Sequence, residues 1–136
     1  QSASRLTSDG AALITDAAFA QKLASLEARL DALELTVLRV LASVADGGAP
    51  GEESSILKVI ATELAQDITE LGVETFGPYA QPAFPDSVVP EGSDNFAIPA
   101  AAAPSVAQYL GARAQSIYGG SNEIQKNIIA KRILAL

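Results

Sequence analysis

The fold is decided by residues 19–44, which read FAQKLASLEARLDALELTVLRVLASV. Apolar side chains recur there at alternating spacings of four and three residues: Phe19, Leu23, Leu26, Leu30, Leu33, Val37, Val40 and Val44. Because an α-helix turns once every ~3.6 residues, this spacing puts the whole series on one helix face. The pattern predicts a helix of about 30 residues that begins at an N-cap, Thr15 or Asp16, and ends at Gly47-Gly48.

Three further leucines, Leu35, Leu38 and Leu41, widen this apolar stripe. A two-stranded coiled coil buries only a narrow seam, so the extra width favours burial against more than one neighbouring helix. A helical bundle is therefore the favoured architecture, and a simple coiled coil is the alternative.

A second helix is expected after a short turn. Residues 46–53, DGGAPGEE, are rich in Gly and Pro, and Ser54 or Ser55 is the predicted N-cap. The apolar residues at or beside helical spacing are Ile56, Val59, Ile60, Leu64, Ile68, Leu71 and Phe76. The helix is expected to close at Gly77-Pro78, and the short link makes the two long helices antiparallel neighbours.

The rest of the chain predicts a long loop and two shorter helices. Residues 78–104 hold six of the seven prolines, and this stretch is expected to be either a functional lid or arm, or a disordered connector. Helices are expected over 105–116 and from Ser121 or Asn122 to the end. The sequence thus predicts one all-α domain over 1–136, an antiparallel helical bundle thin enough that another element should pack against it.

The composition excludes several classes of site. The 136 residues contain no Cys and no His, which rules out disulfides, thiolate or imidazole metal sites and a Ser-His-Asp triad within this sequence. Lys+Arg 9 against Asp+Glu 16 gives a net charge of −7, which argues against nucleic-acid binding, a helix-turn-helix DNA binder included. No apolar run approaches the ~18 residues of a membrane span, so a soluble protein is expected. The absence of Met, even at position 1, suggests a processed chain or a piece of a larger one.

Residues 117–125, IYGGSNEIQ, are the stretch that local structure explains least well. Two glycines allow the backbone to approach a ligand closely, and Ser121 stands where a helix is expected to begin. The first N–H groups of such a helix have no partner within it and bind an anion, or a ribose or phosphate oxygen. A cofactor loop and an ordinary tight turn are the two interpretations.

This stretch also carries a family resemblance. Residues 117–134, IYGGSNEIQKNIIAKRIL, resemble the C-terminal signature of the acyl-CoA dehydrogenases. The resemblance extends upstream through Asp9-Gly10, FAQKLASLEARLDAL and SSILKVIATELAQDITELGVETFGP, and so covers about residues 9 to 136.

The resemblance implies a larger enzyme. Members of this family have an N-terminal helical domain, a middle β-domain and a C-terminal four-helix bundle, of which only the later helices are present here. They bind FAD, dehydrogenate an acyl-CoA thioester between its α and β carbons, and pass electrons to an electron-transfer flavoprotein. The resemblance therefore implies a C-terminal fragment, inactive alone, of a cytoplasmic FAD-dependent homo- or hetero-oligomer.

The resemblance also implies roles for single residues near the end of the chain. Gly120 follows the position of the catalytic base and would lie against the acyl thioester, while Tyr118 would line the substrate pocket or pack within the bundle. Ser121, Asn122 and Glu123 match the stretch that contacts FAD. Taken without the resemblance, these residues are a turn glycine, an N-cap and a first-turn carboxylate.

A second cofactor contact is implied at Glu74 and Gly77, where the family often has a Gln-x-x-Gly-Gly loop that reaches the FAD of a neighbouring subunit. Glu74 replaces the glutamine and Pro78 the second glycine. The alternative is a plain helix end, with Gly77 as the terminating glycine and Pro78 as the stop.

Gly119 departs from the family pattern in a way that bears on activity. Many members place their catalytic glutamate directly after the tyrosine, whereas Gly119 has no side chain. Glu123 is a poor substitute, because a first-turn carboxylate complements the helix dipole. No catalytic residue is assigned: the base lies on an earlier helix, or the chain is a silent subunit of a heteromeric enzyme. The alternative function, outside the enzymes, is a helical assembly module without flavin.

Overall fold

The computed structural model describes residues 7–8, 11–48, 51, 53–77 and 102–135, and this part of the chain is all-α, as predicted. The long helices are α1 (Ala17–Ala45) and α2 (Glu53–Phe76), and the shorter ones are α3 (Ala103–Ala112), the 3-10 turn η4 (Arg113–Ser116) and α4 (Asn122–Arg132). A small hairpin, β1 (Thr7–Ser8) paired antiparallel with β2 (Ala11–Ala12), and the 3-10 turn η1 (Leu13–Thr15) come before them. Strands of two residues are too short to show a period of two in the sequence.

Helix α1 begins and ends where its sequence signals lie. The Asp16 carboxylate accepts a hydrogen bond from the Phe19 N–H at 2.8 Å, which makes Asp16 the N-cap. After Ala45 the chain leaves the helix through Gly47, whose φ of +89° is one that glycine adopts without strain. Both predicted boundaries of this helix are confirmed.

Helix α2 begins earlier than predicted. It starts at Glu53, so Ser54 and Ser55 both lie inside the helix. The N–H of Ser54 donates to the Gly51 carbonyl at 3.2 Å. The prediction that Ser54 or Ser55 caps the helix was therefore wrong, because the Glu53 carboxylate suits the positive end of the helix as a first-turn residue. The other end lies at Phe76, followed by Gly77 at φ +52°, as expected.

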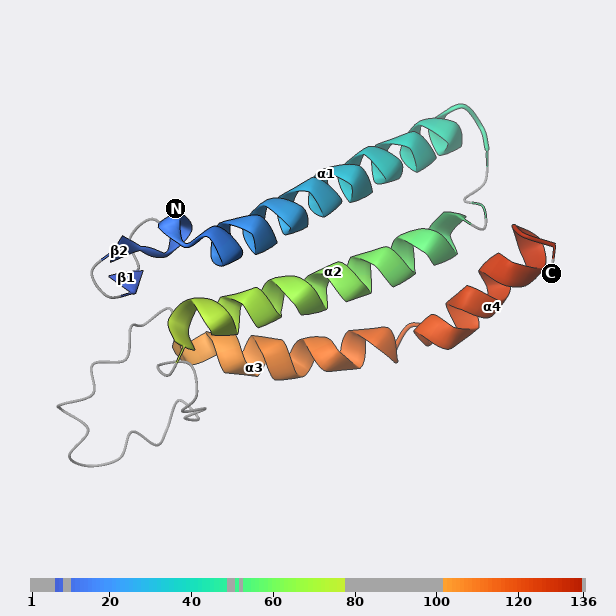
Figure 1. The fold of residues 1–136 in the computed structure, drawn as a ribbon. Helices are drawn as coiled ribbons and strands as arrows, with labels where there is room; N and C mark the ends of the chain where they lie inside the picture. Colours follow the sequence, from blue (N-terminus) through green and yellow to red (C-terminus); the bar gives the residue numbers. More distant parts are fainter. Residues whose placement is uncertain (1–6, 9–10, 49–50, 52, 78–101, 136) are drawn as a thin grey trace.

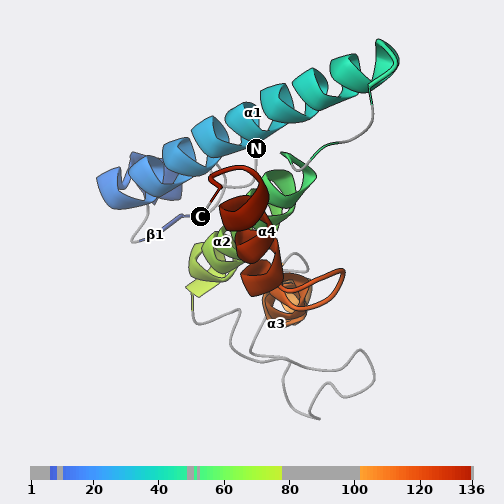
Figure 2. The ribbon, with the colours of Figure 1, turned by 90° about the vertical axis from the view of Figure 1, so that its right-hand side faces the viewer.

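Helix α2 is the central element of the fold. Helix α1 runs antiparallel to it on one side, α3 packs on the other, and α4 lies against its first half (Figures 1 and 2). The buried residues of the described chain come from α2, α3, α4 and the residue before α3: Ser55, Val59, Leu64, Leu71, Ala102, Ser105, Ala112 and Asn122. Leu64, 1% exposed, lies deepest among the large side chains. The core therefore lies between α2 and the two shorter helices.

Helix α1 contributes no buried residue. Its stripe packs against α2, but Leu35, Leu38 and Leu41 are 63%, 53% and 57% exposed, and Leu30 on the stripe itself is 48% exposed. The second neighbour that the wide stripe predicts is thus not among the described helices. These four exposed leucines are called the leucine surface of α1.

Helix α3 also starts before its predicted position. The predicted loop over 78–104 lies outside the described residues up to residue 101, and its last residues, Ala103 and Pro104, belong to the first turn of α3. The predicted loop was wrong at this end because proline is tolerated in the first turn, where its missing N–H has no helical partner.

The predicted helix over 105–116 divides at its end, and the last helix stops short. After Ala112 the backbone tightens into the 3-10 turn η4, and α4 ends at Arg132 instead of running to the C-terminus. Within the described part of the chain, no helix has the length and apolarity to cross a bilayer.

Candidate functional site

The glycine pair at 119–120 forms a loop between η4 and α4. Gly119 has φ +68° and Gly120 φ +93°, a left-handed conformation that side chains with a Cβ rarely adopt. A Cβ added at Gly119 would meet nothing within 4 Å, and one at Gly120 would come within 2.6 Å of the Gln125 amide nitrogen. The backbone conformation favours glycine at both positions, and the space beside the backbone is open at Gly119 but covered by the Gln125 side chain at Gly120.

Ser121 is the N-cap of α4, as predicted. Its hydroxyl oxygen accepts from the Ile124 N–H at 3.4 Å, and its own backbone is extended. The hydroxyl satisfies one of the N–H groups that a helix leaves unpaired in its first turn. The first turn of α4 therefore begins directly at the end of the glycine loop.

Glu123 is fully exposed in this first turn. Its carboxylate accepts hydrogen bonds from its own backbone N–H and from the Ser121 hydroxyl, and these hold the pKa of Glu123 below its usual range. A carboxyl group with a lowered pKa is a weaker proton acceptor than usual. Glu123 thus complements the helix N-terminus and is poorly suited to act as a general base.

Asn122 is the buried member of the loop, at 5% exposure. Its Oδ1 accepts from the Lys58 ammonium at 2.7 Å and from the Thr62 hydroxyl at 3.2 Å, and both donors lie on α2. Sequence reasoning assigned Asn122 and missed both partners. The signal that could have revealed them is a polar stripe at helical spacing on the α2 face turned toward α3 and α4: Ser55, Lys58, Thr62 and Gln66.

Tyr118 lies on the surface beside the loop. Its side chain is 60% exposed and that of the neighbouring Ile117 is 70% exposed, so Tyr118 does not pack within the helices of this chain. Both side chains are available to contact a ligand or another domain.

Glu74 and Gly77 lie at the other end of α2. Glu74 follows Thr62 by 12 residues, about 18 Å along a helix that rises ~1.5 Å per residue. The Lys22 ammonium lies 2.8 and 2.7 Å from the two carboxylate oxygens of Glu74, and the left-handed Gly77 ends the helix. The structure therefore brings Tyr118 and Gly120–Glu123 together but does not bring Glu74 and Gly77 to them.

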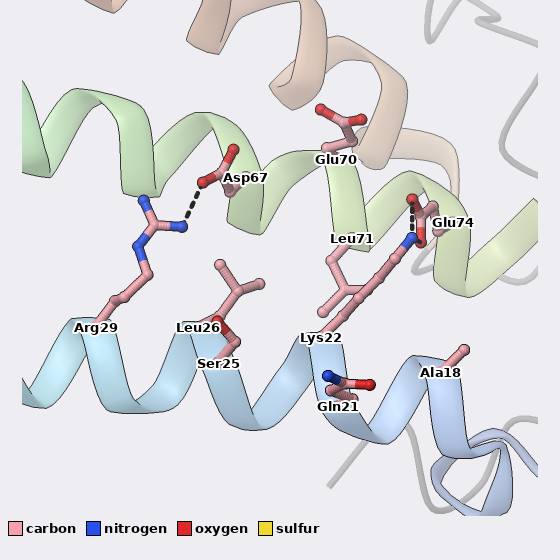
Figure 3. Close-up of a pocket in the computed structure, with 10 residues that line it drawn as sticks. All are labelled: Ala18, Gln21, Lys22, Ser25, Leu26, Arg29, Asp67, Glu70, Leu71 and Glu74. Atoms are coloured by element: carbon pink, nitrogen blue, oxygen red, sulfur yellow. Dashed lines mark hydrogen bonds and ion pairs between the residues drawn. The ribbon is translucent and has the colours of Figure 1, made fainter.

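A groove of about 520 Å³ runs between α1 and α2 at the Glu74 end (Figure 3). Leu26 and Leu71 point toward each other across it, between the ion pairs Lys22–Glu74 at 2.7 Å and Arg29–Asp67 at 2.6 Å. All four charged side chains are roughly half exposed, where ion pairs contribute little stability. The groove is a seam between two helices. Its remaining carboxylate, Glu70, pairs outside the groove with Arg113 at 3.9 Å.

Comparison with known proteins agrees with this architecture. The family model described as "Acyl-CoA dehydrogenase, C-terminal domain" matches residues 1–134. The acyl-CoA dehydrogenase IpdE1 of Mycolicibacterium smegmatis is 71% identical over 28 residues, which make up 21% of this chain and 7% of that protein. IpdE1 of Mycobacterium tuberculosis matches with the same identity, length and coverage. Because the family match extends over nearly the whole chain, the protein belongs to the acyl-CoA dehydrogenase family and corresponds to its C-terminal domain.

Proposed function

We propose that this chain is the C-terminal part of an FAD-dependent acyl-CoA dehydrogenase and supplies contacts to both FAD and the acyl-CoA substrate. The observation that carries the proposal is the left-handed loop at Gly119-Gly120, which leads directly into the N-terminus of α4. A backbone without side chains and a helix N-terminus together favour close approach of an anionic nucleotide. The residues present thus fit the cofactor that the family uses.

Each residue of the loop has a distinct part in this proposal. Gly120 allows the acyl thioester to lie against the main chain, and Tyr118 borders the same space from the surface. Ser121, Asn122 and Glu123 bind the flavin nucleotide through hydroxyl, amide and first-turn backbone groups. The bound flavin supplies the hydride acceptor, and the electrons leave to an electron-transfer flavoprotein.

The α-proton of the substrate requires a base that the described residues do not provide at this loop. Gly119 has no side chain, and the Glu123 carboxylate is already held by hydrogen bonds at the helix N-terminus. The base therefore comes from a carboxylate elsewhere in the assembled enzyme. On its own, this chain is expected to be inactive.

The remaining partners are other parts of the enzyme. The exposed leucines of α1 provide a surface for missing domains or another subunit, in a homo- or hetero-oligomer. Glu74 and Gly77 are far from the glycine loop along α2, which suits a contact with the FAD of a neighbouring subunit. For that contact, Glu74 would have to release Lys22.

A non-catalytic assembly module, or a silent subunit of a heteromeric dehydrogenase, is the second candidate function. It is favoured by two observations: Gly119 lacks the side chain of a base, and α1 presents a long uncovered apolar surface. In this alternative, the leucine surface is the functional site, and the loop at 119–120 is only a tight turn.

Flavin content distinguishes the two functions. In the assembled enzyme, Gly120→Val is expected to lose FAD or substrate binding, because the new side chain strains a left-handed residue and collides with the Gln125 side chain that covers the loop. Gly111→Val is the matched control, since a Cβ at Gly111 on α3 meets nothing within 4 Å and no left-handed φ is involved. Unchanged flavin absorbance and kinetics in the Gly120 variant would remove the cofactor assignment of the loop.

A further inference from the structure

The orientation of the Asn122 side chain is set by a charged donor. An ammonium group has hydrogens to donate and no lone pair to accept, so the Asn122 atom 2.7 Å from Lys58 Nζ has to be the carbonyl oxygen. The amide nitrogen is then turned away from Lys58. A single lysine thereby decides which end of a buried amide faces α2.

The amide nitrogen of Asn122 has no acceptor among the described residues, since both hydrogen bonds of this side chain go to Oδ1. No fully covered side-chain polar atom in the described chain lacks a partner, so this nitrogen must reach the surface. Asn122 is the first residue of α4, between Ser121 and Glu123 in the sequence. Asn122 is thus 95% covered by protein, with two donor hydrogens still to be satisfied.

We propose that Lys58 is a positioning residue for cofactor binding: it fixes Asn122 so that the amide nitrogen donates to an oxygen of the flavin nucleotide, an inference that rests on the proposed function. Lys58 does not touch the nucleotide. It acts by holding Oδ1, which removes the rotation that would exchange donor and acceptor. Pre-ordering a buried donor in this way lowers the entropy lost when the ligand binds.

Thr62 is the weaker of the two donors to Asn122. Its hydroxyl has one hydrogen and lies 3.0 Å from the carbonyl oxygens of both Lys58 and Val59, closer than the 3.2 Å to Asn122. The backbone carbonyls therefore compete for that hydrogen. The Lys58 ammonium carries a charge and is the nearer donor, so its hydrogen bond controls the amide.

The test compares FAD affinity in the assembled enzyme for Lys58→Met and Lys58→Arg. Loss of one charge-assisted positioning contact is expected to weaken FAD binding by about tenfold in the Met variant, and Arg, which keeps a charged donor, restores much of it. Lys126→Met is the matched control, because it removes the same charge from an exposed lysine near the loop. It is expected to leave FAD affinity within about twofold.

A double-mutant cycle separates positioning from direct contact. Lys58→Met is expected to have no further effect on FAD affinity once Asn122 is replaced by alanine, because the lysine acts through the amide. If Lys58→Met lowers FAD affinity just as much in the presence of Asn122→Ala, then Lys58 binds the nucleotide directly. That result would overturn the proposal. Asn122→Asp keeps the acceptor for Lys58 and loses the amide hydrogens, so FAD binding as tight as in the unmodified enzyme would also overturn it.

A spectroscopic measurement on the 136-residue chain tests the orientation without cofactor. The side-chain amide protons of Asn122 are expected to resonate away from the positions of a solvent-exposed asparagine, because Lys58 holds Oδ1. These shifts should move toward the exposed values in Lys58→Met and stay displaced in Lys58→Arg. Signals that do not respond to Lys58→Met would contradict the proposal. If the unmodified assembled enzyme binds no FAD, the proposed function itself fails; if it binds FAD and Lys58→Met changes nothing, only the role of Lys58 fails.

Discussion

Arg113 donates from its guanidinium to the backbone carbonyl of Gln66 at 2.8 Å, while the Gln66 side-chain amide donates to the Ala112 carbonyl at 3.2 Å. This reciprocal pair joins the middle of α2 to the point where α3 tightens into η4. The guanidinium also lies 4.3 Å above the ring of Tyr109. Arg113 therefore ties the end of α3 to the middle of α2.

The stability contributed by Arg113 can be measured directly. Arg113→Met is expected to lower the free energy of unfolding by about 1–3 kcal/mol, because the change removes a charged hydrogen bond and the contact with Tyr109. Arg39→Met on α1 is the control, since Arg39 is exposed and has no ion pair among the described residues. Urea denaturation that gave equal losses for the two variants would contradict this role of Arg113.

The burial of Leu64 is expected to contribute more to the free energy of unfolding than an ion pair on the surface of the molecule. Leu64→Ala leaves a cavity at the most buried large side chain, and the expected loss is about 2–5 kcal/mol. Lys22→Met breaks an ion pair whose side chains are 55% and 41% exposed, and the expected loss is below about 1 kcal/mol. Chemical denaturation of both variants at one pH provides the comparison, and a larger loss for Lys22→Met would be inconsistent with a core between α2 and the shorter helices.

Glu123 makes the stability of the start of α4 depend on pH. Its pKa in the folded chain lies below the usual value of 4.5, so its stabilising effect is fully present above that value and is lost as the pH falls through the folded pKa. Glu123→Gln is expected to lower the Tm at pH 7, and the difference between the two proteins should shrink only in acid.

The Ser121 hydroxyl is part of the cause of this lowered pKa, which supplies an internal check. Ser121→Ala removes that donor, so the change in Tm that Glu123→Gln causes at pH 7 should become smaller when both substitutions are combined. Thermal unfolding followed by circular dichroism from about pH 3 to about pH 8, on either side of the usual carboxyl pKa, measures the effect. A change in Tm that is independent of both pH and Ser121 would contradict it.

The leucine surface of α1 predicts how the chain behaves in solution. Leu38→Lys, which replaces a side chain that is 53% exposed, should reduce binding of a hydrophobic dye and self-association with a change in stability within about 0.5 kcal/mol. Leu26→Lys should lower the Tm by more than Leu38→Lys, because the partly buried Leu26 faces Leu71 across the α1–α2 seam (Figure 3). Equal effects of the two changes on the Tm would mean that α1 is rotated from its described orientation.

The agreement between sequence and structure is best where signals are local. Asp16, Gly47, Gly77 and Ser121 mark helix ends, because an N-cap oxygen or a left-handed glycine acts within one turn of the backbone. The start of α2 was mispredicted since Glu53 and the two serines are all acceptable near a helix N-terminus. The start of α3 was mispredicted because proline permits the first turn of a helix as readily as it ends one.

The candidate site was predictable only in part. Its contiguous members, from Tyr118 to Glu123, are found by motif because they lie on one short stretch. Lys58 and Thr62 are about 60 residues away in the sequence, and each by itself resembles an ordinary polar residue of a helix. Their contacts with Asn122 arise only in the folded chain, where α2 and α4 lie side by side.

The sequence by itself determined the helices, their periodic apolar faces and the glycine-rich loop, because spacing, caps and backbone freedom are properties of neighbouring residues. Only the tertiary structure decided that α2 is central, that α1 keeps a leucine surface uncovered, and that Lys58 reaches Asn122. Those outcomes depend on which face of each helix meets which neighbour. One apolar stripe could be buried against any of several helices. Which helix covers it is decided by side-chain packing and by the hydrogen bonds of buried polar groups.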